Sequence, residues 1–145
     1  MTSSGWPARA VLGFIAAVLS TLIFHQAMWA ALHALGTMPP PFPMAPTAPF
    51  GVPKMISLRF WGGLYGAVYG IALPSLLRPH WLSGFVLGII AALVGLFIVT
   101  AIKGLPIGFG FALWPWVNSL LINGFWGIGV GLITPLLMPR VTRPA

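Results

Sequence analysis

The side chains of this sequence that could do chemistry are few, and most of them lie on one apolar run near the N-terminus. A stripe with one member at every fourth position follows that run: Thr21, His25, Trp29 and His33, with Gln26 beside it. Spacing of four places side chains on one face of a helix. An imidazole inside a membrane costs free energy unless it is hydrogen-bonded or ligated. We therefore weigh three roles for His25: a hydrogen-bonded packing residue, which we favour, a cofactor-binding ligand of a haem or chlorophyll-type macrocycle, and a proton or quinone site.

Two asparagines are the other strongly polar side chains inside an apolar run. Asn118 and Asn123 both lie in the last such run. The rise of a helix places Asn123 at about the same depth as His25, and polar groups in a membrane favour one another. We predict that His25 faces the interior of a helix bundle and pairs with Asn123. Thr21, Gln26 and Asn118 complete the expected polar core.

The sequence contains no aspartate, no glutamate and no cysteine. This composition excludes paired-carboxylate catalysis, carboxylate metal cages, a serine-histidine-aspartate triad and the usual acidic proton relay of a pump. It also excludes a thiolate nucleophile and cysteine-ligated zinc or iron–sulfur sites. We expect a protein that is not an enzyme, has no metal site and, most simply, binds no cofactor.

The elements that must position these residues are membrane helices. Hydrophobic residues make up 59% of the sequence and charged residues 5%, with a mean hydropathy of +1.00, so charged side chains cannot cover a soluble globule. Four apolar runs have about the 20 residues that a helix needs to cross a hydrocarbon core. They lie at residues 10–36, 55–77, 81–102 and 114–138, and we expect the first to be retained as a helix because it lacks the features of a cleaved signal peptide. The predicted fold is all-α: one transmembrane domain, residues 1–145, forming a four-transmembrane-helix bundle.

The connections between the runs differ in character. Residues 37–54 contain prolines at 39, 40, 41, 43, 46, 49 and 53, which favours an extended, polyproline-like path over the outer mouth of the bundle. The second connection is only Arg78-Pro79-His80. Such a short link predicts that spans two and three form a tight antiparallel hairpin.

The cations have the placement of membrane anchors. The net charge is +7, but its seven lysines and arginines are scattered singly at the ends of apolar runs, unlike a surface that follows nucleic-acid phosphates. We expect as partners the lipid bilayer and other membrane subunits or a second copy, and no nucleic acid. Four cations lie on the inner side and three on the outer side when both termini are cytoplasmic, which favours that orientation. The expected interface anchors are Arg9, Arg59, Arg78, Lys103 and Arg140.

Glycines at helical spacing predict where helices pack. Gly62, Gly66 and Gly70 recur at intervals of four in the second run, which lets a neighbouring helix approach to backbone contact. Packing among the four helices is the favoured interpretation, and docking onto a partner subunit is the alternative. The third and fourth runs repeat the pattern with Gly84, Gly88, Gly127 and Gly131.

Two short segments of the chain echo each other. Phe60-Trp61-Gly62 recurs as Phe125-Trp126-Gly127, and Gly70-Ile-Ala-Leu-Pro74 recurs as Gly131-Leu-Ile-Thr-Pro135. The two pieces align only with a gap of four residues, which is about one helical turn. A duplicated two-helix unit would produce this echo. Chance similarity between glycine-rich apolar segments would produce it too, and the sequence leaves both explanations open.

One part of the chain, roughly residues 20 to 70, resembles a group of uncharacterised four-helix inner-membrane proteins from proteobacteria. The segments that carry the resemblance, together with the proline-rich connection, are Phe24-His25-Gln26, Leu32-His33, Gly51-Val52-Pro53 and Ser57-Leu58-Arg59-Phe60-Trp61-Gly62-Gly63. The resemblance implies a bacterial inner-membrane location. It implies no activity.

The function that the sequence favours is that of a non-catalytic accessory or assembly subunit of a larger bacterial inner-membrane complex, respiratory or photosynthetic. The support is the lack of a catalytic constellation, the small extramembrane mass and the glycine faces. A haem- or chlorophyll-type pigment-binding electron-transfer protein using His25 is the alternative. A small transporter or channel is a second alternative, which the absence of acidic coupling residues disfavours.

Overall fold

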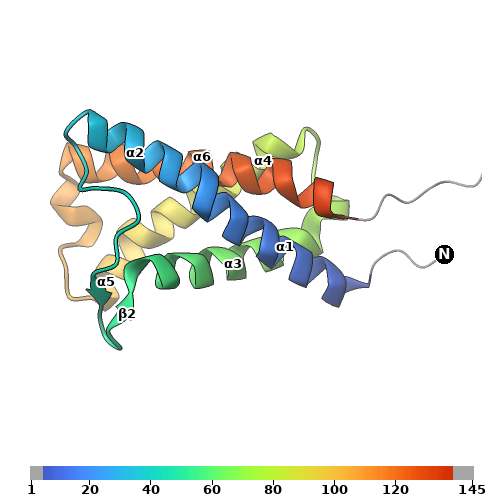
Figure 1. Ribbon diagram of the computed structural model, residues 1–145, viewed down its shortest axis with the longest axis horizontal. Helices are drawn as coiled ribbons and strands as arrows, with labels where there is room; N and C mark the ends of the chain where they lie inside the picture. Colours follow the sequence, from blue (N-terminus) through green and yellow to red (C-terminus); the bar gives the residue numbers. More distant parts are fainter. Residues whose placement is uncertain (1–4, 139–145) are drawn as a thin grey trace, which may run out of the picture.

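The computed structural model describes residues 5–138, and within them four helical segments form the bundle (Figure 1). The first is continuous and comprises α1 (Trp6–Ser20), a π-helical turn (Thr21–His25) and α2 (Gln26–Ala34). The second is α3 (Lys54–Ala72), followed by a 3₁₀ turn (Leu73–Ser75). The third comprises α4 (His80–Val94), a π-helical turn (Gly95–Val99) and α5 (Thr100–Ile102). The fourth is α6 (Leu113–Leu137).

Prolines explain where several helices begin and end. α1 begins at Trp6, four residues before the predicted start, because Pro7 fits the first turn of a helix, where no amide donor is needed. α3 ends at Ala72 and not at residue 77, because Pro74 cannot donate to the helical ladder and lies in the 3₁₀ turn. In α6, Pro135 lies near the C-terminal end.

Three of these helices are long and apolar enough to cross a membrane: Trp6–Ala34, His80–Ile102 and Leu113–Leu137. Helix α3 is not among them. It carries two cations, Lys54 and Arg59, together with glycines and tyrosines that lower its hydropathy. The structure is therefore that of a helical protein with three candidate membrane spans. The predicted fourth span, α3, forms a helix but does not reach the hydropathy expected of a span.

The helices are arranged as two antiparallel hairpins, each closed by glycines. α3 runs back along α1, and a Cβ on Gly66 would collide with Ala17 and with the backbone of Gly13. α6 runs back along α4, and a Cβ on Gly127 would collide with the backbone of Gly84. These contacts place backbone against backbone, where no side chain larger than hydrogen fits.

The two hairpins use the same contact register. The carbonyl of Arg9 lies against Gly70 in the first hairpin, as the carbonyl of His80 lies against Gly131 in the second. One helical turn further on, Gly13 meets Gly66 just as Gly84 meets Gly127. Gly127 is thus the counterpart of Gly66 and not of Gly62. The contact register agrees with the second half of the sequence echo, in which Gly70 aligns with Gly131, and not with the first half.

The proline-rich connection lies at the opposite end of the bundle from the start of α1 and the end of α6 (Figure 1). It is not polyproline-like throughout, because its tip forms a small antiparallel hairpin of β1 (Pro46–Thr47) and β2 (Val52–Pro53). The backbone amides of Lys54 and Met55 donate to carbonyls of the same connection, at 3.0 Å each. The connection is thereby held over the first turn of α3.

Candidate functional site

The predicted polar stripe is buried at its first three members and exposed at its last. A π-helical turn, which closes hydrogen bonds from i to i+5, lies at the start of the stripe, between Thr21 and His25. Thr21, His25 and Trp29 are buried, whereas His33 is exposed, and its Nδ1 lies 2.8 Å from the carbonyl oxygen of Met38 in the proline-rich connection. The stripe therefore leads from the bundle interior out to the connection.

Gln26 joins His25 to that connection. Its Oε1 accepts a hydrogen bond of 2.7 Å from the backbone amide of Phe42. An amide donor requires an acceptor, so the Nε2 of Gln26 faces His25 and donates to its Nδ1 at 3.1 Å. In this arrangement Gln26 occupies Nδ1 of His25 and a proton occupies Nε2.

Trp29 and Lys54 form the next contact under the connection. The indole Nε1 of Trp29 donates to the carbonyl of Pro39 at 2.8 Å, and the Lys54 ammonium lies 5.1 Å from the ring centroid, in cation–π range. Lys54 is the last residue of the connection and the first of α3. Its pKa is lowered from the ordinary lysine value, first because the side chain is partly buried and second because Lys103 lies nearby. Two lysines therefore lie close enough at this end of the bundle for Lys103 to disfavour the charge of Lys54.

The predicted pair of His25 and Asn123 is wrong. Asn123 is half-buried and donates from Nδ2 to the carbonyl of Ser119 on its own helix, at 2.9 Å. The other asparagine makes the inter-segment contact instead. Asn118 donates from Nδ2 to the carbonyl of Thr37 at 3.0 Å and accepts at Oδ1 from the Thr37 hydroxyl at 3.2 Å. Matched depth was not enough to predict the partner, because the direction of each side chain around its helix decides which groups meet.

The polar side chains at this end have one common function in the structure. Gln26, Trp29, His33 and Asn118 each contact the backbone of the proline-rich connection, whose prolines supply no amide donors. They fasten it to two helices, the α1–α2 segment and α6. The proline-rich connection is thus packed onto the helices and forms a defined surface of the protein.

Three phenylalanines in the two connections at this end of the bundle have an unusual backbone. Phe42, Phe109 and Phe111 have φ values of 55°, 50° and 59°, a left-handed region that bulky residues rarely adopt. Residues held there cost on the order of 1–3 kcal/mol each and persist only where their surroundings fix them. Phe42 is fixed by Gln26, and Phe111 by its stack on Trp116, with ring centroids 5.7 Å apart.

The rings of these residues are accessible at this end of the bundle. Phe42 is 51% exposed and Phe50, at the tip of the connection, is 88% exposed. Phe109 and Phe111 lie in the other connection at this end (Ile107–Phe111), which Trp116 holds by donating to the carbonyl of Gly108 at 2.9 Å. We call these four phenylalanines the outer aromatic surface, after the orientation that the cations predict.

The seam between α1 and α6 holds a second polar cluster, deeper in the bundle. The hydroxyl of Ser20 donates to the carbonyl of Trp126 at 2.6 Å. The indole Nε1 of Trp126 faces the carbonyl of Ala17 at 3.2 Å and the hydroxyl of Thr21 at 3.1 Å. Gly129 lies against Ser20 and has no room for a Cβ. All polar atoms of this seam are used within the protein, and they form no open site.

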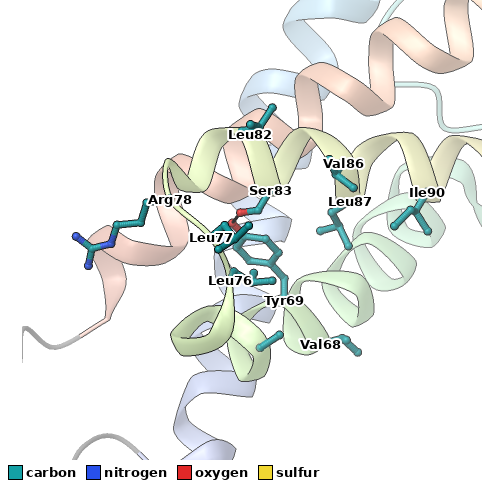
Figure 2. A pocket seen from close by; sticks show the side chains of 11 residues that line it. Val68, Tyr69, Leu76, Leu77, Arg78, Leu82, Ser83, Val86, Leu87 and Ile90 are labelled. Carbon is teal, nitrogen blue, oxygen red and sulfur yellow. Dashed lines mark hydrogen bonds between the residues drawn. The ribbon is translucent and has the colours of Figure 1, made fainter.

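The seam between α3 and α4 holds a groove of about 410 Å³ (Figure 2). Its walls are aliphatic side chains of α3, of α4 and of the connection between them. Inside it the hydroxyls of Tyr69 and Ser83 point toward one another, 2.7 Å apart, and both face the carbonyl of His80. Arg78 lies at its end and extends outward from the connection (Figure 2).

The remaining predicted residues have the following positions. Gly66, Gly70, Gly84, Gly88, Gly127 and Gly131 are buried between helices, while Gly62 is half-buried beside Trp126. Of the predicted interface anchors, Arg9 and Arg59 are half-buried, Arg78 and Lys103 are exposed, and Arg140 lies outside the described residues.

Comparison with known proteins does not assign this arrangement to a family. No protein-family model, no curated protein and no solved structure matches the chain. Within residues 5–138 no three side chains of the metal-binding types come together. The function must therefore be argued from the contacts of the chain itself.

Sequence reasoning missed several residues on which these sites depend. Gly13 and Ala17 form the α1 face that receives α3, and their spacing of four from each other was a signal that could have found them. Trp126 closes the α1–α6 seam, but a tryptophan in an apolar run looks like any other core residue. No pattern in the sequence indicates the left-handed phenylalanines.

Proposed function

We propose that the protein is a non-catalytic accessory or assembly subunit of a larger bacterial inner-membrane complex, and that it docks through the outer aromatic surface. The observation that carries this proposal is the exposure of phenylalanine rings on backbone held at positive φ. A fixed, exposed aromatic surface on loops is typical of an interaction site. Because the segments are already ordered, a partner binding them would lose little conformational entropy.

The polar residues support the same proposal by elimination. His25, Gln26 and Asn118 were the candidates for a ligand or transport site, and they make internal hydrogen bonds that fasten the connection. Neither the groove between α3 and α4 nor a second apolar groove of about 370 Å³ beside α6 includes His25. The geometry around His25 therefore favours neither the pigment-binding nor the transporter alternative.

The proposal includes four membrane spans with both termini in the cytoplasm. α3 packs antiparallel along α1 through Gly66 and Gly70, and a helix paired with a spanning helix occupies the same depth of the bilayer. The exposed residue Ala48 tests the orientation, because the chain has no cysteine of its own. Ala48→Cys should react with an impermeant maleimide from the periplasmic side. Labelling from the cytoplasmic side alone would reverse the topology.

The docking proposal is tested by native mass spectrometry after gentle detergent extraction. The wild type should emerge with larger subunits in fixed stoichiometry, and the double variant Phe42→Ala, Phe50→Ala should lose them while its helical circular dichroism is unchanged. Phe60→Ala is the matched control, since Phe60 is also 51% exposed but lies on α3. A wild-type protein that emerges alone, or one that carries a Soret or near-infrared chromophore, would contradict the proposal.

A further inference from the structure

The groove between α3 and α4 is suited to an apolar occupant. Aliphatic residues line it from both helices and from the connection. The exposed ones include Val68, Leu77, Leu82, Val86 and Ile90, and Leu76 is half-buried. The only hydroxyls in its lining belong to Tyr69 and Ser83, and they satisfy each other and the carbonyl of His80. Apart from Arg78 at its end, the groove therefore offers a polar ligand no free side-chain donor.

The length of the groove corresponds to one leaflet. On α4 it extends from Leu82 to Ile90, which is about 12 Å of helix. One leaflet accounts for about half of a hydrocarbon core of roughly 30 Å. A transmembrane helix of a partner would cross both leaflets and would need a groove about twice as long. An acyl chain that begins at the interface fits this length.

The positive charge of Arg78 at the end of the groove favours a lipid with an anionic headgroup. Arg78 is exposed beside the groove, in the connection from α3 to α4 (Figure 2). The sequence has no acidic side chain to pair with it. A second copy of this chain would bring a further charge of +7, whereas a phospholipid phosphate is complementary. The second groove, beside α6, has no cation in its lining.

We infer that the α3–α4 groove is a binding site for one anionic glycerophospholipid. One acyl chain lies along Val86 and Ile90, and the phosphate lies at Arg78. Basic residues at the end of a cleft between transmembrane helices are a known means of holding anionic headgroups. This inference goes beyond the proposed function, since the groove lies at the opposite end of the bundle from the outer aromatic surface.

The test measures lipid retention by the purified full-length protein. Mixed micelles would contain phosphatidylglycerol and phosphatidylcholine with identical acyl chains, and native mass spectrometry would count each bound lipid. The wild type should retain one phosphatidylglycerol in preference to phosphatidylcholine. Arg78→Gln should reduce that preference about fivefold. Val86→Trp, which fills the groove, should reduce retention of both lipids.

Two matched variants separate a site from the general lipid annulus. Lys103→Gln removes an exposed cation at the other end, and Ile98→Trp changes a residue 53% exposed, close to the 50% of Val86 but outside the groove. Both should retain phosphatidylglycerol like the wild type. Equal retention of the two lipids by the wild type, or equal losses in the control variants, would overturn the inference. Loss of a protein subunit from the complex in Val86→Trp, with lipid retention unchanged, would also overturn it.

Discussion

The two seams that join the hairpins occupy equivalent positions but differ in structure. In each, the first helix of one hairpin faces the second helix of the other, as α1 faces α6 and α4 faces α3. The α1–α6 seam is closed by Trp126 and by the hydrogen bond from Ser20, whereas α3 and α4 make far fewer contacts and leave a groove. Glycines at the same register allow close helix packing in both hairpins. The side chains between the hairpins differ, and for this reason the α1–α6 seam is closed and the α3–α4 seam is open.

Removing the side chain that closes the seam should have the largest effect. Trp126→Ala deletes a buried indole and its contacts to Ala17 and Thr21, and should lower the free energy of unfolding by about 3–5 kcal/mol. Reversible SDS unfolding in mixed micelles measures this loss. Trp61→Ala is the control, because Trp61 is exposed and its loss should cost far less. Equal costs would mean that the seam does not depend on Trp126.

The hairpin interfaces should be equally sensitive to an added methyl group. Gly66→Ala and Gly127→Ala each place a Cβ against backbone of the partner helix, and each should cost about 1–3 kcal/mol through overpacking. Gly95→Ala is the control, since a Cβ there meets nothing within 4 Å. Thermal unfolding in detergent compares the three variants. A large difference between Gly66→Ala and Gly127→Ala would break the equivalence of the hairpins.

The smallest predicted effect compares one hydroxyl in each seam. Ser20→Ala loses the hydrogen bond to the carbonyl of Trp126 and should cost about 0.6–1.7 kcal/mol in a membrane environment. Ser83→Ala should cost less, because the Tyr69 hydroxyl still donates to the carbonyl of His80. SDS unfolding of both variants measures the difference. If Ser83→Ala were the more costly, the α3–α4 seam would be held more tightly than its groove indicates.

The end of the bundle under the proline-rich connection shows how far polar patterns could predict a site. The sequence identified His25, Gln26 and Asn118 as candidates for a polar core, and all three are buried. It did not predict that Gln26 and Asn118 would bond to the proline-rich connection, because nothing in the sequence indicates where an irregular segment will fold back. The pairing of His25 with Asn123 failed because depth along a helix does not fix the direction around it: His25 meets Gln26, and Asn123 donates to Ser119 of its own helix.

The order of residues was enough to predict the apolar helices, their approximate ends and the lack of acidic and thiol side chains. Hydrophobic period, hydropathy and the positions of prolines are local properties, so each helix can be predicted separately from its neighbours. The packing of the helices was needed to learn which glycine faces meet, that Gly127 corresponds to Gly66, and that one seam holds a groove ending at Arg78. These features depend on how each helix is rotated against its neighbours. That rotation is set by backbone contacts between segments that lie far apart in the sequence.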